Sequence, residues 1–234
     1  GFSLRKIILS YLSKKYFEKR KLLTPDYLEI NSENIVKLKE LLIKYNIEAP
    51  YVIKPRDEGA GIDVSFTETS SELFRIAKSL LEKHKNLIVE PFVKGIEITV
   101  PVLEIGGKAI PLATVEIEKA KRVKVFSNDI KSLLQFSPQK IGEKIVKYRI
   151  PARLNRIVSE KAMKDAVAAH ESIGCEGYSR VDMIIDGANN IFVLEINSLP
   201  TLSEYGIFSK AAKLKGLEYK DIVNYIIRSA LYPK

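Results

Sequence analysis

Residues 178–197 read YSRVDMIIDGANNIFVLEIN and contain two largely apolar stretches on either side of a polar turn. Residues 178–186 and 191–197 are rich in apolar and β-branched side chains over short lengths, which is typical of β-strands. The intervening GANN (187–190) supplies the residue types that favour a tight turn. The segment therefore predicts an antiparallel hairpin, and the rest of the chain is interpreted outward from it.

The register of this hairpin decides which polar side chains meet. If the turn is centred in the middle of GANN, regular pairing sets Asp182 opposite Glu195 and Arg180 opposite Asn197. Side chains two apart on a strand share a face. All four polar groups are therefore expected on one face of the hairpin.

Two carboxylates placed directly opposite each other repel and destabilise a bare sheet, so a cation is expected between them. Carboxylate and amide oxygens suit Mg²⁺, which phosphate and water usually complete. Arg180 can bind a phosphate or an oxyanion beside that site with its planar fork. The alternative is a solvated polar face on an edge hairpin, with a salt bridge from Arg180 to Asp182.

A second informative stretch is residues 51–67, YVIKPRDEGAGIDVSFT. It predicts a strand, a glycine-containing loop and a second strand joined as a hairpin. A lysine at the end of the first strand (Lys54), with the loop behind it, can contact phosphates through one cation and backbone N–H groups. No GK[ST] follows the glycines, so the loop is not a P-loop, and a plain hairpin turn is the alternative.

A third stretch, LIVEPFV (87–93), is an apolar strand that leads towards Glu97. Such a strand can bind an adenine with backbone groups and a ribose with the carboxylate. The alternative is a core strand followed by a surface acid.

Elsewhere, apolar spacing and turn residues outline the remaining elements. A long basic loop or lid is expected over residues 119–148. Ser159 is expected to cap the helix that Gly174 ends. The other predicted elements are helices over residues 4–23, 32–45, 69–85 and 159–173, strands over 97–104 and 108–117, and two short C-terminal helices that Gly216 separates.

The chain has 234 residues, 38 Lys and Arg against 29 Asp and Glu, one Cys and no Trp. No apolar run is long enough to span a bilayer, no signal-peptide pattern opens the chain, and a single Cys forms no internal disulfide. A cytoplasmic protein with no membrane partner is the expectation. The net charge of +9 favours a polyanionic partner, or reflects lysines that solvate helix faces. A nucleic-acid binder that uses the first helix and residues 119–147 is disfavoured, because no basic block is interleaved with aromatic residues.

Four strings in this order resemble the ATP-grasp ligases, most closely the D-alanine–D-alanine ligase group. They are VIKPRDEGAGIDVSF, LIVEPFVKGIEITVPVLE, YRIPARL and GCEGYSRVDMIIDGANNIFVLEINSLP. The resemblance implies an α+β fold with nucleotide between two ATP-grasp subdomains. We expect the start of a helix over residues 1–14, a small subdomain over 15–92, and a large subdomain with the metal site over 93–234. The group's N-terminal domain would precede Gly1.

The resemblance also implies roles at matching positions of this sequence. Asp182, Glu195 and Asn197 match metal ligands, Arg180 matches the arginine that stabilises the transferred phosphoryl group, and Lys131 is similar to the lysine that reaches the terminal phosphate. Lys15 is placed as the early phosphate lysine, with Lys14 and Lys19 as competing positions. The other ATP positions are Lys54, the covering loop Gly59, Ala60 and Gly61, the adenine-edge contacts Glu90 and Val93, the ribose ligand Glu97, and apolar contacts to the base from Val52, Phe92, Ile184 and Leu194.

The implied activity is that of an ATP-dependent carboxylate–amine ligase that forms an amide through an acyl phosphate. ATP and Mg²⁺ are the implied cofactors, with two metal ions and Mn²⁺ as an alternative ion. The implied small-molecule partner is an amino-acid-like or dipeptide-like substrate. The expected protein partner is either a second copy of this chain, in a homodimer, or a separate chain that supplies the N-terminal domain. The alternative is a catalytically idle module that binds Mg-ATP and lacks a complete substrate site.

Overall fold

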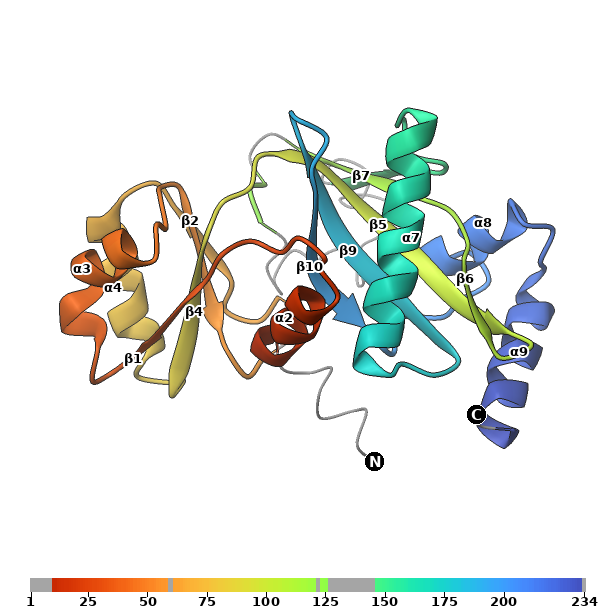
Figure 1. Cartoon of the computed structure of the whole chain (residues 1–234), viewed down its shortest axis with the longest axis horizontal. Coiled ribbons are helices and arrows are strands. Elements are labelled where there is room, and N and C mark those ends of the chain that lie inside the picture. Colours follow the sequence, from red (N-terminus) through yellow and green to blue (C-terminus); the bar gives the residue numbers. More distant parts are fainter. Residues whose placement is uncertain (1–9, 59–60, 121–122, 126–145, 233–234) are drawn as a thin grey trace.

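The computed structural model describes residues 10–58, 61–120, 123–125 and 146–232. Within them, two antiparallel sheets lie side by side (Figure 1). We call residues 28–92 the small lobe, and residues 10–23 with 95–232 the large lobe. Each lobe has its own hydrophobic core, so the cleft between them is bounded by two separately packed bodies.

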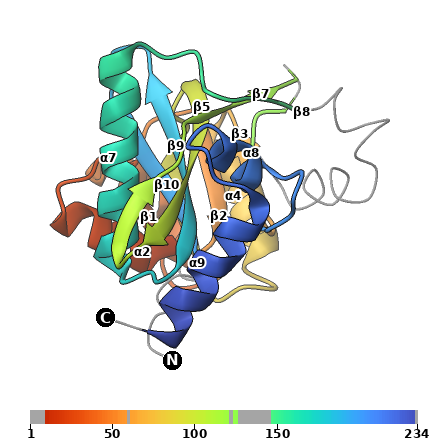
Figure 2. The same cartoon turned by 90° about the vertical axis from the view of Figure 1, so that its right-hand side faces the viewer.

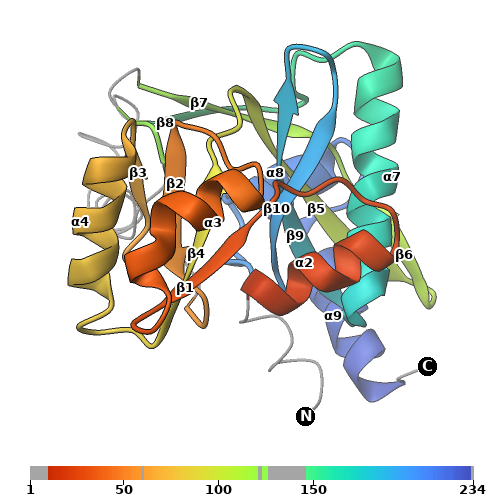
Figure 3. The same cartoon turned by 60° about the vertical axis from the view of Figure 1, so that its left-hand side comes forward.

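The small lobe is a four-stranded sheet in the order β1-β4-β2-β3, counted over the described residues. The helices α3 and α4 cover its outer face, away from the large sheet (Figures 1 and 3). Along β2, Tyr51 and Ile53 are buried towards these helices, so Val52 and Lys54 face the other way. The elements are β1 (Leu28–Asn31), a 3-10 turn (Ile35–Lys37), α3 (Leu38–Lys44), β2 (Tyr51–Pro55), β3 (Ser65–Thr67), α4 (Ser70–Leu80) and β4 (Asn86–Pro91).

The large lobe holds a second sheet in the order β10-β9-β5-β7-β8, with β6 paired to β5. Figure 2 shows α7 on one face of this sheet and α8 and α9 on the other. The elements are α2 (Ser10–Lys19), β5 (Gly95–Ile105), β6 (Lys108–Pro111), β7 (Val115–Lys119), β8 (Val146–Arg149), α7 (Arg156–Ile173), β9 (Tyr178–Asp186), β10 (Ile191–Asn197), α8 (Ile207–Lys213) and α9 (Tyr219–Leu231).

Alternation along β9 positions the functional face. Val181, Met183 and Ile185 are buried against α2 and α7. Residues 180, 182 and 184 therefore project from the opposite face, where α7 does not cover the sheet. The predicted hairpin is confirmed with the expected bounds.

The helix α2 packs on the large lobe rather than the small one. Phe17 and Leu22 belong to the large core, and the Val193 amide donates to the Leu23 carbonyl at 2.8 Å. Because of this packing, the two cores divide near Leu28 rather than at residue 15. The second expected boundary, at residue 92, falls in the connection between β4 and β5.

Several local expectations differ from the structure, among them the single strand expected over residues 108–117, which is divided into β6 and β7. Residues 28–31, for which no strand was predicted, form β1 and pair with β4. Residues 146–149 form β8 along β7, within and just beyond the stretch expected to be a loop. The cap of α7 is Asn155, whose Oδ1 accepts the Val158 amide at 2.9 Å, one turn before the expected Ser159. Within the described residues, no helix has the length and apolar character needed to cross a membrane.

Candidate functional site

A cleft of about 820 Å³ lies between the two lobes. Strand β2 and the end of β4 form one wall, and strands β5, β7, β9 and β10 form the other. The cleft is lined by Val52, Lys54, Gly61, Glu90, Phe92 and Val93 from the small lobe side, and by Glu97, Thr99, Lys119, Tyr148, Arg180, Asp182, Ile184, Leu194, Glu195 and Asn197 from the large lobe. Most residues predicted for a nucleotide and metal site therefore meet in one cavity.

The four polar residues of the hairpin lie as the register predicted. Glu195 pairs with Asp182 and Asn197 pairs with Arg180 on neighbouring strands. The path to this pairing differs from the regular hairpin that was expected. The three-residue loop 187–189 is closed by Asp186 and Asn190, and a bulge at Leu194 then restores the register.

The bulge explains why two consecutive residues, Leu194 and Glu195, both line the cleft. In a regular strand, neighbours point to opposite faces, whereas an extra residue in one strand removes that alternation locally. An apolar wall and a carboxylate thus occupy the same side of β10.

Asp182 is the centre of a polar network. Its Oδ1 accepts a hydrogen bond from Thr99 Oγ1 at 2.5 Å, and its Oδ2 accepts one from Asn197 Nδ2 at 3.1 Å. Arg180 Nε lies 3.2 Å from Asp182 Oδ1. The Asp182 carboxylate raises the pKa of Arg180, so the guanidinium remains charged. The salt bridge of the alternative interpretation thus exists, but it lies in the cleft rather than on an open face.

The donor set tests whether a hard cation fits. The described residues contain no group of three His, Cys, Asp or Glu side chains arranged to hold a metal ion. A cation at the hairpin would therefore use the two carboxylates of Asp182 and Glu195, the amide oxygen of Asn197, and oxygens from a ligand. This set fits Mg²⁺, which typically takes one or two carboxylates and completes its shell with phosphates and water.

Across the cleft, Glu90 holds two lysines. Its Oε1 lies 2.8 Å from Lys54 Nζ and 3.2 Å from Lys14 Nζ. Burial opposes the charge on Glu90, but the two ammonium groups outweigh it and lower the pKa of Glu90. Burial lowers the pKa of Lys14 to about 8, although Glu90 opposes that shift. Lys14 also donates to Thr24 Oγ1 and to the Pro25 carbonyl, which lie in the connection between α2 and β1.

Lys15, the position placed first for the early phosphate lysine, does not join this group. Its side chain is exposed, and its Nζ lies 4.5 Å from the centre of the Tyr11 ring. The neighbouring Lys14 is fully buried beside Glu90. Gly59, Ala60 and Lys131 lie outside the described residues.

Glu97, the expected ribose ligand, pairs with Lys119 through Oε2 and Nζ. Burial raises the pKa of Glu97, with Lys119 opposing that shift. Sequence reasoning missed Thr99, Lys119 and Tyr148, which also line the cleft. Thr99 carried a signal, since it follows Glu97 by two residues and therefore shares its face. Tyr148 carried another, since it opens the string YRIPARL.

Comparison with known proteins agrees with this geometry. The family described as "D-ala D-ala ligase C-terminus" matches residues 17–228. A protein named D-alanine--D-alanine ligase in Carboxydothermus hydrogenoformans is 30% identical over 223 residues, which cover 94% of this chain and 68% of that protein. The chain spans about 55 to 68% of the lengths of its curated relatives.

Solved structures show the same fold. VanG D-Ala:D-Ser ligase from Enterococcus faecalis matches with a TM-score of 0.79 at 22% identity, over 97% of this chain and 62% of that one. D-alanine--D-alanine ligase from Bacillus anthracis complexed with ATP matches with a TM-score of 0.72 at 22% identity, over 98% and 68% of the two chains. The α+β fold expected from the sequence is confirmed. The chain belongs to the D-ala D-ala ligase C-terminal family and has the ATP-grasp fold.

Proposed function

We propose that this chain provides the ATP- and metal-binding part of an ATP-dependent carboxylate–amine ligase. The observation that supports this most is that Arg180, Asp182, Glu195 and Asn197 face one cleft, opposite a second wall that presents Lys54. Phosphoryl transfer depends on positioning and on neutralising charge, and lysines, an arginine and hard-oxygen ligands provide both. A relative that carries the name D-alanine--D-alanine ligase and a structure complexed with ATP support the same assignment.

The proposed reaction has two steps. An oxygen of the substrate carboxylate attacks the terminal phosphorus of ATP, and ADP leaves with the electron pair of the broken P–O bond. An amine then attacks the acyl phosphate, and an amide forms as phosphate departs. A bound Mg²⁺ would neutralise phosphate charge. Arg180 offers its fork to the transferred phosphoryl group, and Lys54 pairs with the nucleotide phosphates.

The substrate is proposed to bind where the cleft reaches Ser203 and Gly206. A Cβ atom added at Gly206 would lie 2.7 Å from Ser203 Oγ, so a side chain there requires Ser203 to move. The carbonyl of Ser203 is held by the Gly206 amide at 3.1 Å and by Ser209 Oγ at 2.6 Å. This end of the cleft therefore suits a small amino-acid-like substrate that makes no contact with a side chain at position 206.

A second candidate is a module that binds Mg-ATP without turnover. Adding MgATP with a panel of amino acids separates the two. Amino-acid-dependent ADP release supports the ligase, whereas a rise in melting temperature with MgATP and no ADP release across the panel supports the idle module. A protein that shows neither response contradicts both proposals.

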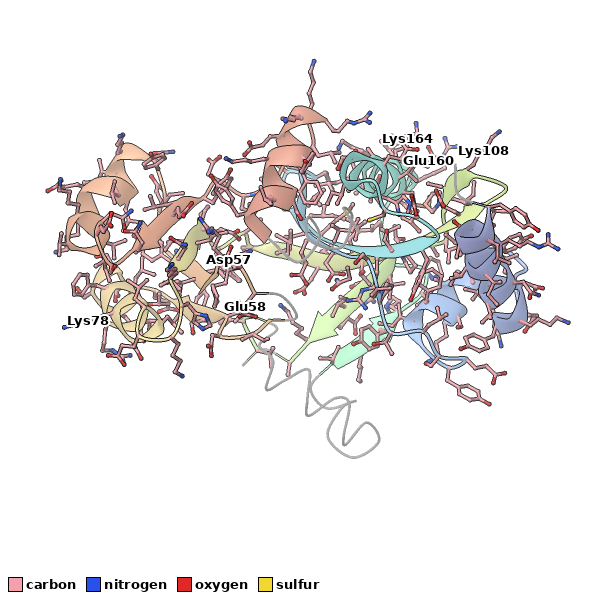
Figure 4. All side chains as sticks on the ribbon, turned by 90° about the horizontal axis from the view of Figure 1, so that it is seen from below. Asp57, Glu58, Lys78, Lys108, Glu160 and Lys164 are labelled. Atoms are coloured by element: carbon pink, nitrogen blue, oxygen red, sulfur yellow. The ribbon has the colours of Figure 1, made fainter. Side chains whose placement is uncertain are left out.

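The variant Lys54→Ala is expected to weaken ATP binding by roughly 10-fold, since it removes one charge-assisted contact to phosphate. Titration calorimetry measures the affinity. Lys78→Ala is the matched control, because Lys78 lies on the outer side of α4, away from the cleft (Figure 4). Equal affinity in wild type and Lys54→Ala would remove the assigned role.

A further inference from the structure

Glu97 and Lys119 form an ion pair that no part of the proposed reaction has used. Strand β5 pairs with β7 through Ile98 with Glu116 and Thr99 with Val115, which sets Glu97 beside Ile117. Lys119 follows Ile117 by two residues on the same face of β7, so it is a diagonal neighbour of Glu97 and within its reach. Only 15% of the Glu97 side chain and 18% of the Lys119 side chain are exposed.

The ammonium of Lys119 is held from a second direction as well. Its Nζ donates to the carbonyl oxygen of Lys124 at 3.1 Å. Two acceptors on different segments thus fix one flexible side chain, and the Glu97 carboxylate is fixed in turn. Since both residues line the cleft, this pair sets the position of one acid on its wall.

Glu97 needs such a partner. Burial raises its pKa, and the charges of Asp182 and Glu195 act in the same direction. The ammonium of Lys119 opposes both effects, although the pKa of Glu97 stays raised. An ionised carboxylate only accepts hydrogen bonds, and a pair of vicinal hydroxyl groups supplies two donors.

We propose that Lys119 is a positioning residue for the nucleotide, which holds the Glu97 carboxylate in place to accept hydrogen bonds from the two hydroxyl groups of the ribose. The inference rests on the proposed ATP site. It assigns Lys119 no contact with the phosphates, since its ammonium already faces the carboxylate of Glu97 and the Lys124 carbonyl.

The test compares MgATP with 2′,3′-dideoxy-ATP, which keeps the phosphates and lacks both hydroxyl groups. We expect Lys119→Met to weaken binding of MgATP by roughly 10-fold, the size of a charge-assisted hydrogen bond. We expect the affinity of Lys119→Met for the dideoxy nucleotide to stay within about 2-fold of wild type. This nucleotide lacks the hydroxyl groups that Glu97 would bind, so the position of Glu97 no longer affects binding. Lys119→Arg should restore part of the preference for MgATP.

The matched control is Lys124→Met, which removes one cation from the same cleft but keeps the carbonyl that Lys119 binds. It should leave the ratio of the two affinities unchanged. Equal losses on both nucleotides in Lys119→Met would indicate a phosphate contact or a general distortion, and would overturn the inference. An unchanged MgATP affinity would overturn it as well.

Failure of the proposed function is recognised separately. A wild-type protein that binds neither nucleotide contradicts the ATP site itself before any variant is compared, and the inference falls with it. If wild-type protein binds MgATP and the dideoxy nucleotide with equal affinity, the ATP site stands and only the role of the Glu97–Lys119 pair is overturned. Should Lys119→Met fold poorly, shown by a lower melting temperature, Lys119→Arg and Glu97→Gln carry the comparison. Glu97→Gln should then lose the preference for MgATP.

Discussion

Asp182→Asn and Glu195→Gln are each expected to lower Mg²⁺-dependent ADP release by at least roughly 100-fold, since each removes one of the two carboxylates that face the proposed cation. In Asp182→Asn, an amide NH2 also replaces one of two carboxylate oxygens, of which Oδ1 accepts from Thr99 and Oδ2 accepts from Asn197, so one of these contacts loses its acceptor. The fold should survive, because both side chains point into the cleft rather than into the core.

Two measurements check this prediction. ADP release reports turnover, and the affinity for Mn²⁺ in the presence of nucleotide reports the metal site without requiring turnover. Glu160→Gln is the matched control, because it removes one carboxylate from the outer face of α7 (Figure 4). Wild-type Mn²⁺ affinity in both hairpin variants would refute the metal assignment.

Glu90→Gln is expected to reduce the free energy of unfolding by about 3 to 5 kcal/mol, the usual cost of removing one partner from a buried ion pair. The substitution keeps the shape of the side chain and removes its charge. Lys14 then remains fully buried as a cation, with Lys54 close by and no anion between them. Chemical denaturation followed by circular dichroism measures the loss.

The pH dependence of that loss follows from Lys14. Its folded pKa of about 8 lies below its ordinary value of 10.5, so the unfolded chain binds more protons and this group makes stability rise with pH over that interval. Glu90 raises the pKa of Lys14, so Glu90→Gln lowers it further. The variant then loses the proton at a lower pH than wild type. Its stability deficit should therefore shrink as the pH rises towards about 8.

The exposed pair of Glu29 and Arg56 provides the control for this second prediction. Both side chains are about 30% exposed, and Arg56 Nη1 lies 2.6 Å from Glu29 Oε1. Glu29→Gln is expected to cost under about 1 kcal/mol, because water screens a surface pair. A Glu90→Gln deficit no larger than that of Glu29→Gln, or one that grows towards pH 8, would contradict the account of a buried triad.

The sequence predicted the hairpin well because two apolar, strand-forming stretches are joined by a short polar turn. Strand β1 was missed, since the four residues LEIN alternate over too short a length to stand out and their partner β4 is distant in sequence. The apolar run IFVL (191–194) departs from strict alternation, but it does not reveal which of its residues is the extra one. The predicted pairing of Asp182 with Glu195 was right because two differences cancel. The turn is centred half a residue earlier than predicted, which shifts the register by one residue, and the extra residue in β10 shifts it back.

Some residues of the candidate site could also be predicted from the sequence, and others could not. Residues inside distinctive strings, such as Asp182 and Glu195, could be placed from the sequence. The choice between Lys14 and Lys15 depended on which side of α2 faces Glu90, and packing on the large core sets that side. Lys119 has no motif around it, and only the pairing of β5 with β7 brings it to Glu97.

The extra residue in β10 separates two tasks on one strand. Val193 pairs with Met183 and Glu195 pairs with Asp182, so Leu194 is the only residue between these pairs without an opposite neighbour. Shortening the chain by this one position would leave every remaining pair of the hairpin in step. A deletion within a strand normally turns all later side chains over, but here it would remove one apolar contact and keep the polar face intact. The apolar wall of the cleft can therefore vary in evolution independently of the charged groups beside it.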